Sequence, residues 1–255
     1  MDAQHSQPIN LGERIDSLDV LRGVAILGIL LMNIVTFSMV LATYTNPSVY
    51  NDLSGADWWT WLTLHLFVDQ KFMTVFSVLF GAGVCIFMER ATAKNHSAWK
   101  LQASRMGWLL VIGLIHAYLI WYGDVLVSYA VAGMAIALVR SWKPMTLFVV
   151  GIAVMLFVPL LFNAVGYLTV PHWPEDEIAR FQNTVNLDSN ENMAEIAAYT
   201  GSWLDQLSHR IPMSLIIHFF YVPIYIFWHV AGLMLMGMVI LLKDRDLTGI
   251  LILEI

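Results

Sequence analysis

The chain has 255 residues, of which 58% are hydrophobic and only 13% are charged. A water-soluble domain carries roughly 25% charged residues, so this chain has too little polar surface to cover a soluble globule of its size. The composition excludes an ordinary soluble protein. It predicts an all-α, polytopic membrane protein in one transmembrane domain, residues 1–255.

The first expected helix runs from about Ser17 to Ala42, after a polar N-terminal segment. Ser17 is a good N-cap, and Asp19 places a negative charge in the first turn, where the helix dipole favours it. Arg22 lies three residues after Asp19, on the same helix face. The run that follows is uncharged, and its one polar side chain, Asn33, lies roughly 16 Å further along the axis at 1.5 Å per residue. This helix therefore places an arginine at the membrane surface and an amide deep in the bilayer.

An aromatic segment and five further membrane helices follow. Their expected ranges are 58–68 for the aromatic segment, which suits an interfacial helix or the outer end of the next span, and then 71–88, 105–121, 125–139, 145–168 and 211–242. The last range is long enough either to kink at Pro223 or to begin as an interfacial piece. A basic loop, 89–105, separates the second and third spans. One long polar segment, 169–210, contains expected surface helices near 175–183 and 191–207, and residues 249–255 read like the beginning of a further helix.

The positive charges decide the expected orientation of these six spans. With the N-terminus inside, ten of the 13 lysines and arginines lie on the inner side, and Lys71, Arg180 and Arg210 lie outside. The positive-inside rule therefore predicts that both termini face the cytoplasm and that the acidic 169–210 segment is an outer loop.

Polar side chains inside the expected spans are the candidate functional residues, because such groups are costly in lipid and tend to face the bundle interior. His116 is expected near mid-bilayer, and Asp124 follows eight residues later near the same face. A histidine titrates near neutral pH and can take and return a proton, with a carboxylate to orient it. Other interpretations stay open: a buried neutral His116 bonded to a neighbour, Asp124 as the N-cap of the next helix, and Asn33 as an interhelical packing bond.

Lys71 and His229 are further candidates for the same polar pocket. Lys71 lies at the outer end of a helix, where a lysine usually extends its ammonium to the interface. His218 and His229 share a helix face but lie too far apart to bind one metal, and the small-residue patch Ala231-Gly232 favours a packing role for both histidines. The sequence contains no HExxH, P-loop or GxGxxG motif and no Cys/His cluster with metal spacing. We therefore expect no metal site, no tightly bound cofactor and no nucleic-acid partner.

Several of these segments together resemble the bacterial YeiB-like family of inner-membrane proteins. They are Ser17–Ile34, Lys71-Phe with Leu79-Phe-Gly-Ala-Gly83, His116 with Gly123-Asp-Val-Leu126, and Ala231–Gly237. The resemblance covers nearly the whole chain but only the N-terminal part of the family, whose members look longer and have further spans. It implies a multi-pass protein of the cell inner membrane.

The first helix also resembles a wider superfamily of transmembrane acyltransferases, which includes the heparan-glucosaminide N-acetyltransferases, in Ser17-Leu-Asp-x-x-Arg-Gly23 and in Asn33. This resemblance implies that an acyl donor such as acetyl-CoA enters from the basic cytoplasmic face, where Arg22, Asp19 and Arg105 bind it. His116, oriented by Asp124, would then deprotonate a hydroxyl or amine of a small-molecule or glycan acceptor from outside. Asn33 would donate to the developing oxyanion.

Three functions stay open on the sequence: a membrane acyltransferase, a small-solute transporter or channel, and a non-catalytic scaffold or truncated gene product. A cavity that joins both membrane faces through His116 and Asn33 favours the enzyme. A pore without a donor-sized mouth favours transport, and a closed bundle with all polar groups satisfied favours the scaffold. Each is compatible with an oligomer in the lipid bilayer.

Overall fold

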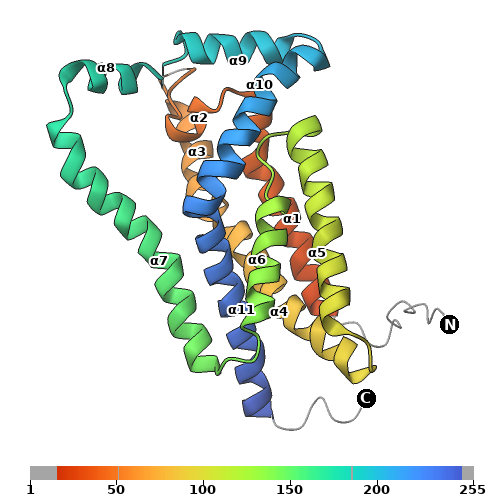
Figure 1. Ribbon diagram of the computed structural model, residues 1–255. Helices are drawn as coiled ribbons and strands as arrows, with labels where there is room; N and C mark the ends of the chain where they lie inside the picture. Colours follow the sequence, from red (N-terminus) through yellow and green to blue (C-terminus); the bar gives the residue numbers. More distant parts are fainter. Residues whose placement is uncertain (1–15, 51, 185, 249–255) are drawn as a thin grey trace.

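The computed structural model describes residues 16–50, 52–184 and 186–248, and every regular element in these ranges is a helix (Figure 1). The α-helices are α1 (Asp16–Ser38), α2 (Ala42–Thr45), α3 (Gly55–Phe67), α4 (Lys71–Ala93), α5 (Ala98–Ile115), α6 (Leu126–Leu138), α7 (Pro144–Thr169), α8 (Glu175–Thr184), α9 (Asn190–Thr200), α10 (Trp203–Ile216) and α11 (Phe227–Thr248). Two π-helical segments, η2 (His116–Ile120) and η4 (Ile217–Ile226), continue α5 and α10, and a 3₁₀ turn, η3 (Val170–His172), continues α7. The polar segment expected before residue 16 and the helix expected at 249–255 lie outside the described residues.

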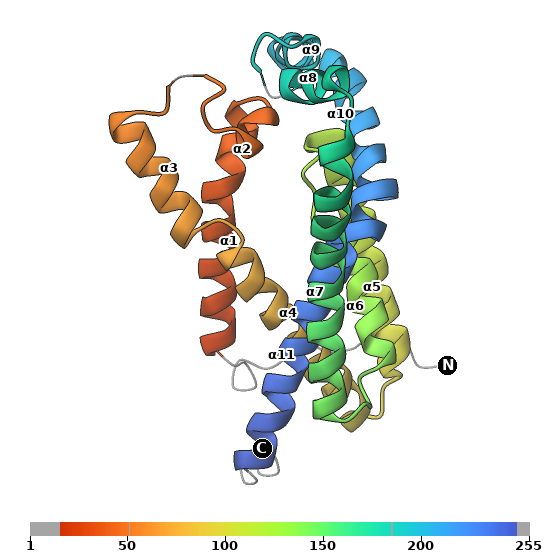
Figure 2. The same cartoon turned by 90° about the vertical axis from the view of Figure 1, so that its left-hand side faces the viewer.

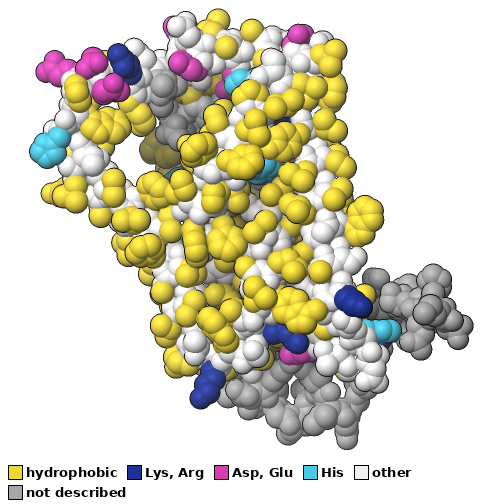
Figure 3. Space-filling view, in the orientation of Figure 1, with side chains coloured by type: hydrophobic (Ala, Val, Ile, Leu, Met, Phe, Trp, Pro, Cys, Tyr) yellow, Lys and Arg dark blue, Asp and Glu magenta, His cyan; other side chains and the backbone are white. Residues whose placement is uncertain are grey.

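Five helical runs are long and apolar enough to cross a membrane: Ser17–Ser38, Gly55–Ala93, Ala98–Ile120, Pro144–His172 and Trp203–Leu242. The remaining expected span, α6, is apolar but has only 13 residues. Hydrophobic side chains cover the sides of the bundle between its two ends (Figure 3). Monomeric soluble proteins rarely expose apolar surface on this scale, so the chain is an integral, multi-pass membrane protein.

Charged side chains gather at the two ends of the bundle. In Figure 3 the acidic side chains cluster around α8 and α9, and most lysines and arginines lie at the opposite end. We call the end formed by α2, α8 and α9 the acidic end, and the end formed by loops 94–97 and 139–143 the basic end. Helices α8 and α9 lie across the bundle rather than along it (Figure 1), in keeping with their expected place on a surface. That the basic end faces the cytoplasm stays a prediction.

Four expected ranges are wrong, for local reasons. The basic loop expected at 89–105 contains only residues 94–97, because α4 continues to Ala93 and α5 begins at Ala98 after a turn in which Asn95 has a φ of 55°. The last membrane helix begins at Trp203 rather than Ile211, because Ser202 and Asp205 form a capping box there. The same cap divides the helix expected at 191–207 into α9 and α10. The first helix ends at Ser38 rather than Ala42, and the short α2 follows it.

The core of the bundle surrounds α11, which packs against α4, α6 and α7. Glycines allow these helices to approach closely. A methyl group built on Gly237 of α11 would overlap the Val78 carbonyl of α4, and one built on Gly81 of α4 would overlap the Met234 carbonyl of α11. A methyl group on Gly232 would lie 2.7 Å from the Gly151 carbonyl of α7. The close helix approach expected at Ala231-Gly232 is therefore confirmed.

Candidate functional site

His116 lies where the regular α5 helix widens into the π-helical turn η2. The turn closes with a hydrogen bond of 2.8 Å from the Trp121 backbone N–H to the His116 carbonyl. Short π-helical segments inside α-helices are frequent at functional sites. Because the helix begins at Ala98 instead of Arg105, His116 lies close to the acidic end of the bundle, and the expectation that it lies midway along its span is wrong.

The chain after η2 descends into the bundle without helical hydrogen bonds. Helix α6 is short and begins below the ends of α5 and α10, so residues 121–125 run inside the helices (Figure 1). Tyr122 and Asp124 in this segment are both only 3% exposed. Irregular backbone at membrane depth is tolerated only where it is buried in protein or lines a cavity. Residues 121–125 are therefore a candidate functional segment.

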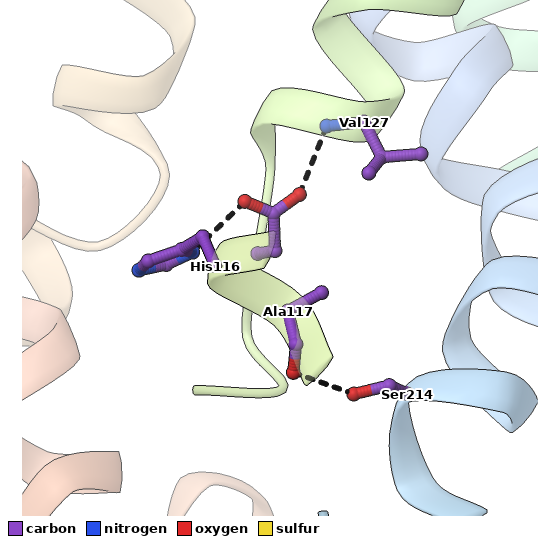
Figure 4. Close-up of polar contacts among 5 residues, drawn as sticks. His116, Ala117, Val127 and Ser214 are labelled. Atoms are coloured by element: carbon purple, nitrogen blue, oxygen red, sulfur yellow. Dashed lines mark hydrogen bonds and ion pairs between the residues drawn. The ribbon is translucent and has the colours of Figure 1, made fainter. Parts of the chain in front are cut away.

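Asp124 connects this segment to His116. Its Oδ1 lies 2.9 Å from His116 Nδ1, and its Oδ2 accepts a hydrogen bond of 2.9 Å from the Val127 backbone N–H (Figure 4). The Asp124 side chain has no exposed surface, whereas 32% of the His116 side chain is exposed. The two roles considered for Asp124 are therefore combined, since one oxygen orients the histidine and the other caps the first turn of α6.

Two side chains of α10 satisfy backbone carbonyls of the η2 turn. Ser214 Oγ donates to the Ala117 carbonyl at 2.9 Å (Figure 4). Arg210 Nη1 donates to the Leu119 carbonyl at 2.8 Å, and Nη2 donates to Gln206 Oε1 at 2.8 Å. Arg210, expected among the outer-loop charges, is only 2% exposed, because α10 packs against η2. Helix α10 thus holds the turn that carries His116.

Replacing Arg210 by methionine is expected to lower the free energy of unfolding by about 2 kcal/mol, the cost of removing a hydrogen-bonded charge of this kind. The Leu119 carbonyl keeps only Trp203 Nε1, at 3.1 Å, as a side-chain donor. The measurement is thermal unfolding in detergent beside Arg180→Met, whose side chain is 72% exposed on α8. Equal midpoints for the two variants would contradict a structural role for Arg210.

A cavity of about 1090 Å³ lies next to this turn, in the acidic half of the bundle. Asn33 of α1 and Asp124 both line it, so the structure brings these two candidates to one space. His116 is not among the lining residues, but Trp121 is, and the Trp121 ring meets the His116 ring edge-on at a centroid distance of 6.2 Å. His116 therefore lies directly behind one wall of the cavity.

Glu195 and His209, which were not among the residues predicted from the sequence, also line the cavity. Glu195 of α9 is 6% exposed and accepts hydrogen bonds from the Leu41 backbone N–H at 3.2 Å and from the Tyr122 hydroxyl at 3.3 Å. It fastens α9 to the acidic ends of α1 and α5. In the sequence, Glu195 is one of several acids in a polar segment, and nothing in its local pattern distinguishes it from the exposed ones.

The predicted donor-binding residues come together at the basic end, apart from the cavity. Arg22 pairs with Asp19 at 3.1 Å and donates to the Leu79 carbonyl of α4 at 3.2 Å. Arg105 lies over the rings of Phe80 and Phe87, at 5.5 and 5.1 Å from their centroids. Both guanidinium groups therefore contact the same stretch of α4, at Leu79 and Phe80.

Lys71 and His229 do not join either group. Lys71 is exposed at the first residue of α4, as expected for a lysine that reaches the interface. His229 stacks on Tyr225 at a centroid distance of 6.1 Å, and His218 Nδ1 lies 3.3 Å from the Tyr118 hydroxyl. Neither Lys71 nor the two histidines line the cavity. Among the described residues, no group of three or more His, Cys, Asp or Glu side chains could hold a metal ion.

Comparison with known proteins gives relatives without an assigned activity. The chain is 38% identical over 161 residues to the uncharacterized protein YeiB of Escherichia coli (strain K12), covering 60% of this chain and 40% of that protein. It is 34% identical over 197 residues to the uncharacterized protein YxaH of Bacillus subtilis (strain 168), covering 75% and 49%. It is also 34% identical over 165 residues, 64% and 44%, to an uncharacterized 39.9 kDa protein from the amylase 3′ region of Bacillus acidopullulyticus.

These matches support the resemblance to the YeiB-like family, and the chain spans less than half the length of each of the three relatives. No protein-family model matches the chain. No solved structure matches it either.

Proposed function

We propose that this protein is a membrane acyltransferase. It moves an acyl group from a thioester donor such as acetyl-CoA, bound at the basic end, to a hydroxyl or amine acceptor in the cavity. The observation that carries the proposal is the His116–Asp124 pair, a partly exposed imidazole held at 2.9 Å by a fully buried carboxylate beside a large cavity. This is the arrangement that a general base requires.

The chemistry follows from the hydrogen bond. In the tautomer that donates its Nδ1 proton to Asp124, His116 carries a free electron pair on Nε2. In our proposal the Trp121 ring, which lies between His116 and the cavity, turns aside when the acceptor binds. Nε2 then takes the proton of the acceptor while the acceptor oxygen or nitrogen attacks the thioester carbonyl carbon. When the tetrahedral intermediate collapses, the carbon–sulfur bond breaks and His116 returns the proton to the leaving thiolate. The products are the acylated acceptor and the free thiol.

Asn33 is the oxyanion donor in this proposal. Outside the ladder of α1, its one hydrogen bond among the described residues uses its backbone carbonyl, which accepts from Thr36 Oγ1 at 3.0 Å. The side-chain amide on the cavity wall is therefore free to donate to a developing negative charge. A preorganised donor of this kind contributes about 3 kcal/mol to catalysis.

Phe72 lies between the predicted donor-binding arginines, Arg22 and Arg105, and the cavity. A methyl group built on Gly28 would overlap the Phe72 ring, so this ring presses against the α1 backbone between Arg22 and Asn33. Phe72 also lines the cavity, whereas Arg22 and Arg105 do not. In our proposal the acyl end of the donor passes Phe72 when this ring changes its rotamer.

Replacing Arg22 by alanine is expected to weaken acetyl-CoA binding by at least about tenfold, because a hydrogen bond to a charged group contributes about 1.5–3 kcal/mol. The His116→Ala variant should keep donor binding, since a general base is not needed to bind. Calorimetry on the protein in lipid nanodiscs measures both, with Arg180→Ala on α8 as the control. No binding by the unchanged protein would contradict a donor site in this chain.

Transport of a small solute is the second candidate function. The observation that favours it is that the cavity lies in the acidic half of the bundle and does not join both membrane faces through His116 and Asn33, the feature expected of the enzyme. Pro223 within the π-helical segment η4 supplies a break in the adjacent helix. Acyl transfer by the unchanged protein that is lost in the His116→Ala variant would favour the enzyme, because a transporter catalyses no such transfer.

A further inference from the structure

The lining of the cavity changes from polar to apolar along its length. We infer that the cavity binds an amphiphile, with a hydrocarbon chain in its apolar part and an amine head at the acidic end, and that this amine is the acceptor. The inference rests on the proposed function for the role of the amine. The binding itself depends only on the wall of the cavity.

The apolar part of the cavity suits a hydrocarbon chain. Its walls are side chains of α1, of the start of α4, and of α10 with η4: Ile29, Met32, Phe72, Met213, Ile216 and Ile226. A small water-soluble acceptor would leave these walls without a partner. A hydrocarbon chain covers them with van der Waals contacts, in place of the contacts that it makes with lipid.

The polar part of the cavity is negative. Four carboxylates line it (Asp69, Asp124, Glu191 and Glu195), and no lysine or arginine does so in the described part of the chain. An anionic head, such as a phosphate diester, is repelled from such a wall, whereas a protonated amine is attracted to it. Charge therefore selects an amine head among the common amphiphiles. Before it reacts, the ammonium group gives one proton to a carboxylate of the wall, and the neutral amine then attacks while His116 takes the second proton.

Hydrogen bonds at the rim keep this wall in place. The Tyr44 hydroxyl donates to Asp69 Oδ1 at 2.8 Å and accepts from Gln70 Nε2 at 3.1 Å. Burial, followed by the neighbouring Asp69, raises the pKa of Tyr44 to about 12, so the phenol keeps its proton. The second Asp69 oxygen, Oδ2, lies 3.3 Å from His65 Nδ1, so Asp69 is a fixed acceptor at the entrance of the head group.

Helices α3 and α7 lie outside the wall of the cavity. Neither contributes a lining residue, and no residue of α3 is buried. Figure 2 shows α3 leaning away from the rest of the bundle, and α7 packs mainly against α11.

The test is photolabelling of the protein in nanodiscs of phosphatidylcholine with a diazirine-bearing dodecylamine. We expect labels on peptides containing Ile29–Asn33 and Met213–Ile217. Excess dodecylamine should remove them, and dodecanoate of the same chain length should compete at least about tenfold more weakly. Asp69→Asn combined with Glu191→Gln should weaken labelling several-fold, and the matched control is Glu175→Gln, an exposed acid on α8 outside the cavity.

Three outcomes would overturn the inference: labels spread over the lipid-facing surface of α5 and α7, equal competition by dodecanoate, or labelling unchanged in the double variant. Thermal unfolding of each variant shows that it is folded. Labelling requires no acyl transfer, so the amphiphile site and the acyltransferase activity are tested independently of each other. An amphiphile bound without transfer contradicts the proposed enzyme, and transfer to glucosamine with no labelling of the cavity contradicts the amphiphile.

Discussion

Replacing His116 by alanine is expected to lower the rate of acyl transfer by about 10²- to 10⁴-fold, the usual contribution of a positioned general base. The acceptor would have to lose its proton to water, since the buried Asp124 carboxylate is occupied by Val127 and lies behind the imidazole. The measurement is the release of free thiol from acetyl-CoA by the protein in nanodiscs containing dodecylamine. Donor binding should be unchanged in the same preparation.

Asp124 and His229 provide the controls for this experiment. Asp124→Asn keeps an oxygen that can accept from the Val127 N–H, so α6 keeps its cap while His116 loses its carboxylate partner. Asp124→Ala loses the cap as well and should cost about 1 kcal/mol more in stability. His229→Ala removes a histidine that lies away from the cavity and should leave the transfer rate unchanged. A rate loss for His229→Ala equal to that for His116→Ala would refute the role assigned to His116.

The largest loss of stability is expected from Gly237→Val in α11. The added side chain would overlap the Val78 carbonyl of α4, and backbone in a helix cannot move aside as a flexible side chain can. Overpacking of a core typically costs 1–3 kcal/mol, and a clash with backbone belongs at or above the top of this range. We expect the variant to be recovered from membranes at a small fraction of the normal yield and to unfold at a much lower temperature in detergent.

Gly166→Val in α7 is the matched control, because a methyl group built at this position meets nothing within 4 Å among the described residues. Both changes replace a helical glycine by the same residue, so their difference isolates the α4–α11 contact. Equal yields and equal unfolding temperatures for the two variants would show that the close approach at Gly237 does not stabilise the bundle.

The sequence predicts the helical membrane architecture because its signals are local. The signals are the long apolar runs, the charged residues Asp19 and Arg22 at the start of α1, and the small residues Ala231-Gly232. Each acts within one helix or between neighbouring helix faces. These features appear in the structure as expected. The sequence also places His116 and Asp124 near one helix face, but eight residues of helix would separate them by about 12 Å along the axis. Their contact of 2.9 Å forms because the helix ends at Ile120 and the chain turns back into the bundle.

The wall of the cavity and the support of the η2 turn were not predictable, because both depend on contacts between segments that are far apart in the sequence. Glu195 meets the Leu41 N–H, and Arg210 meets the Leu119 carbonyl, across long stretches of chain. In the sequence both are ordinary charges of a polar loop. Neither position shows that α9 and α10 fold back over the ends of α1 and α5. The early start of α5, which moves His116 toward the acidic end, depends on the turn at Asn95.

The role of His116 as a base in acyl transfer is tested by following the transfer of a ¹³C-labelled acetyl group from acetyl-CoA with mass spectrometry of the products. The protein is held in phosphatidylcholine nanodiscs and is offered dodecylamine, dodecan-1-ol and glucosamine together, beside the His116→Ala variant. Our account predicts labelled N-acetyl dodecylamine with the unchanged protein and at least a hundredfold less with the variant. No acetylated product, or the same amount from both proteins, would contradict an acyltransferase that uses His116 as its base.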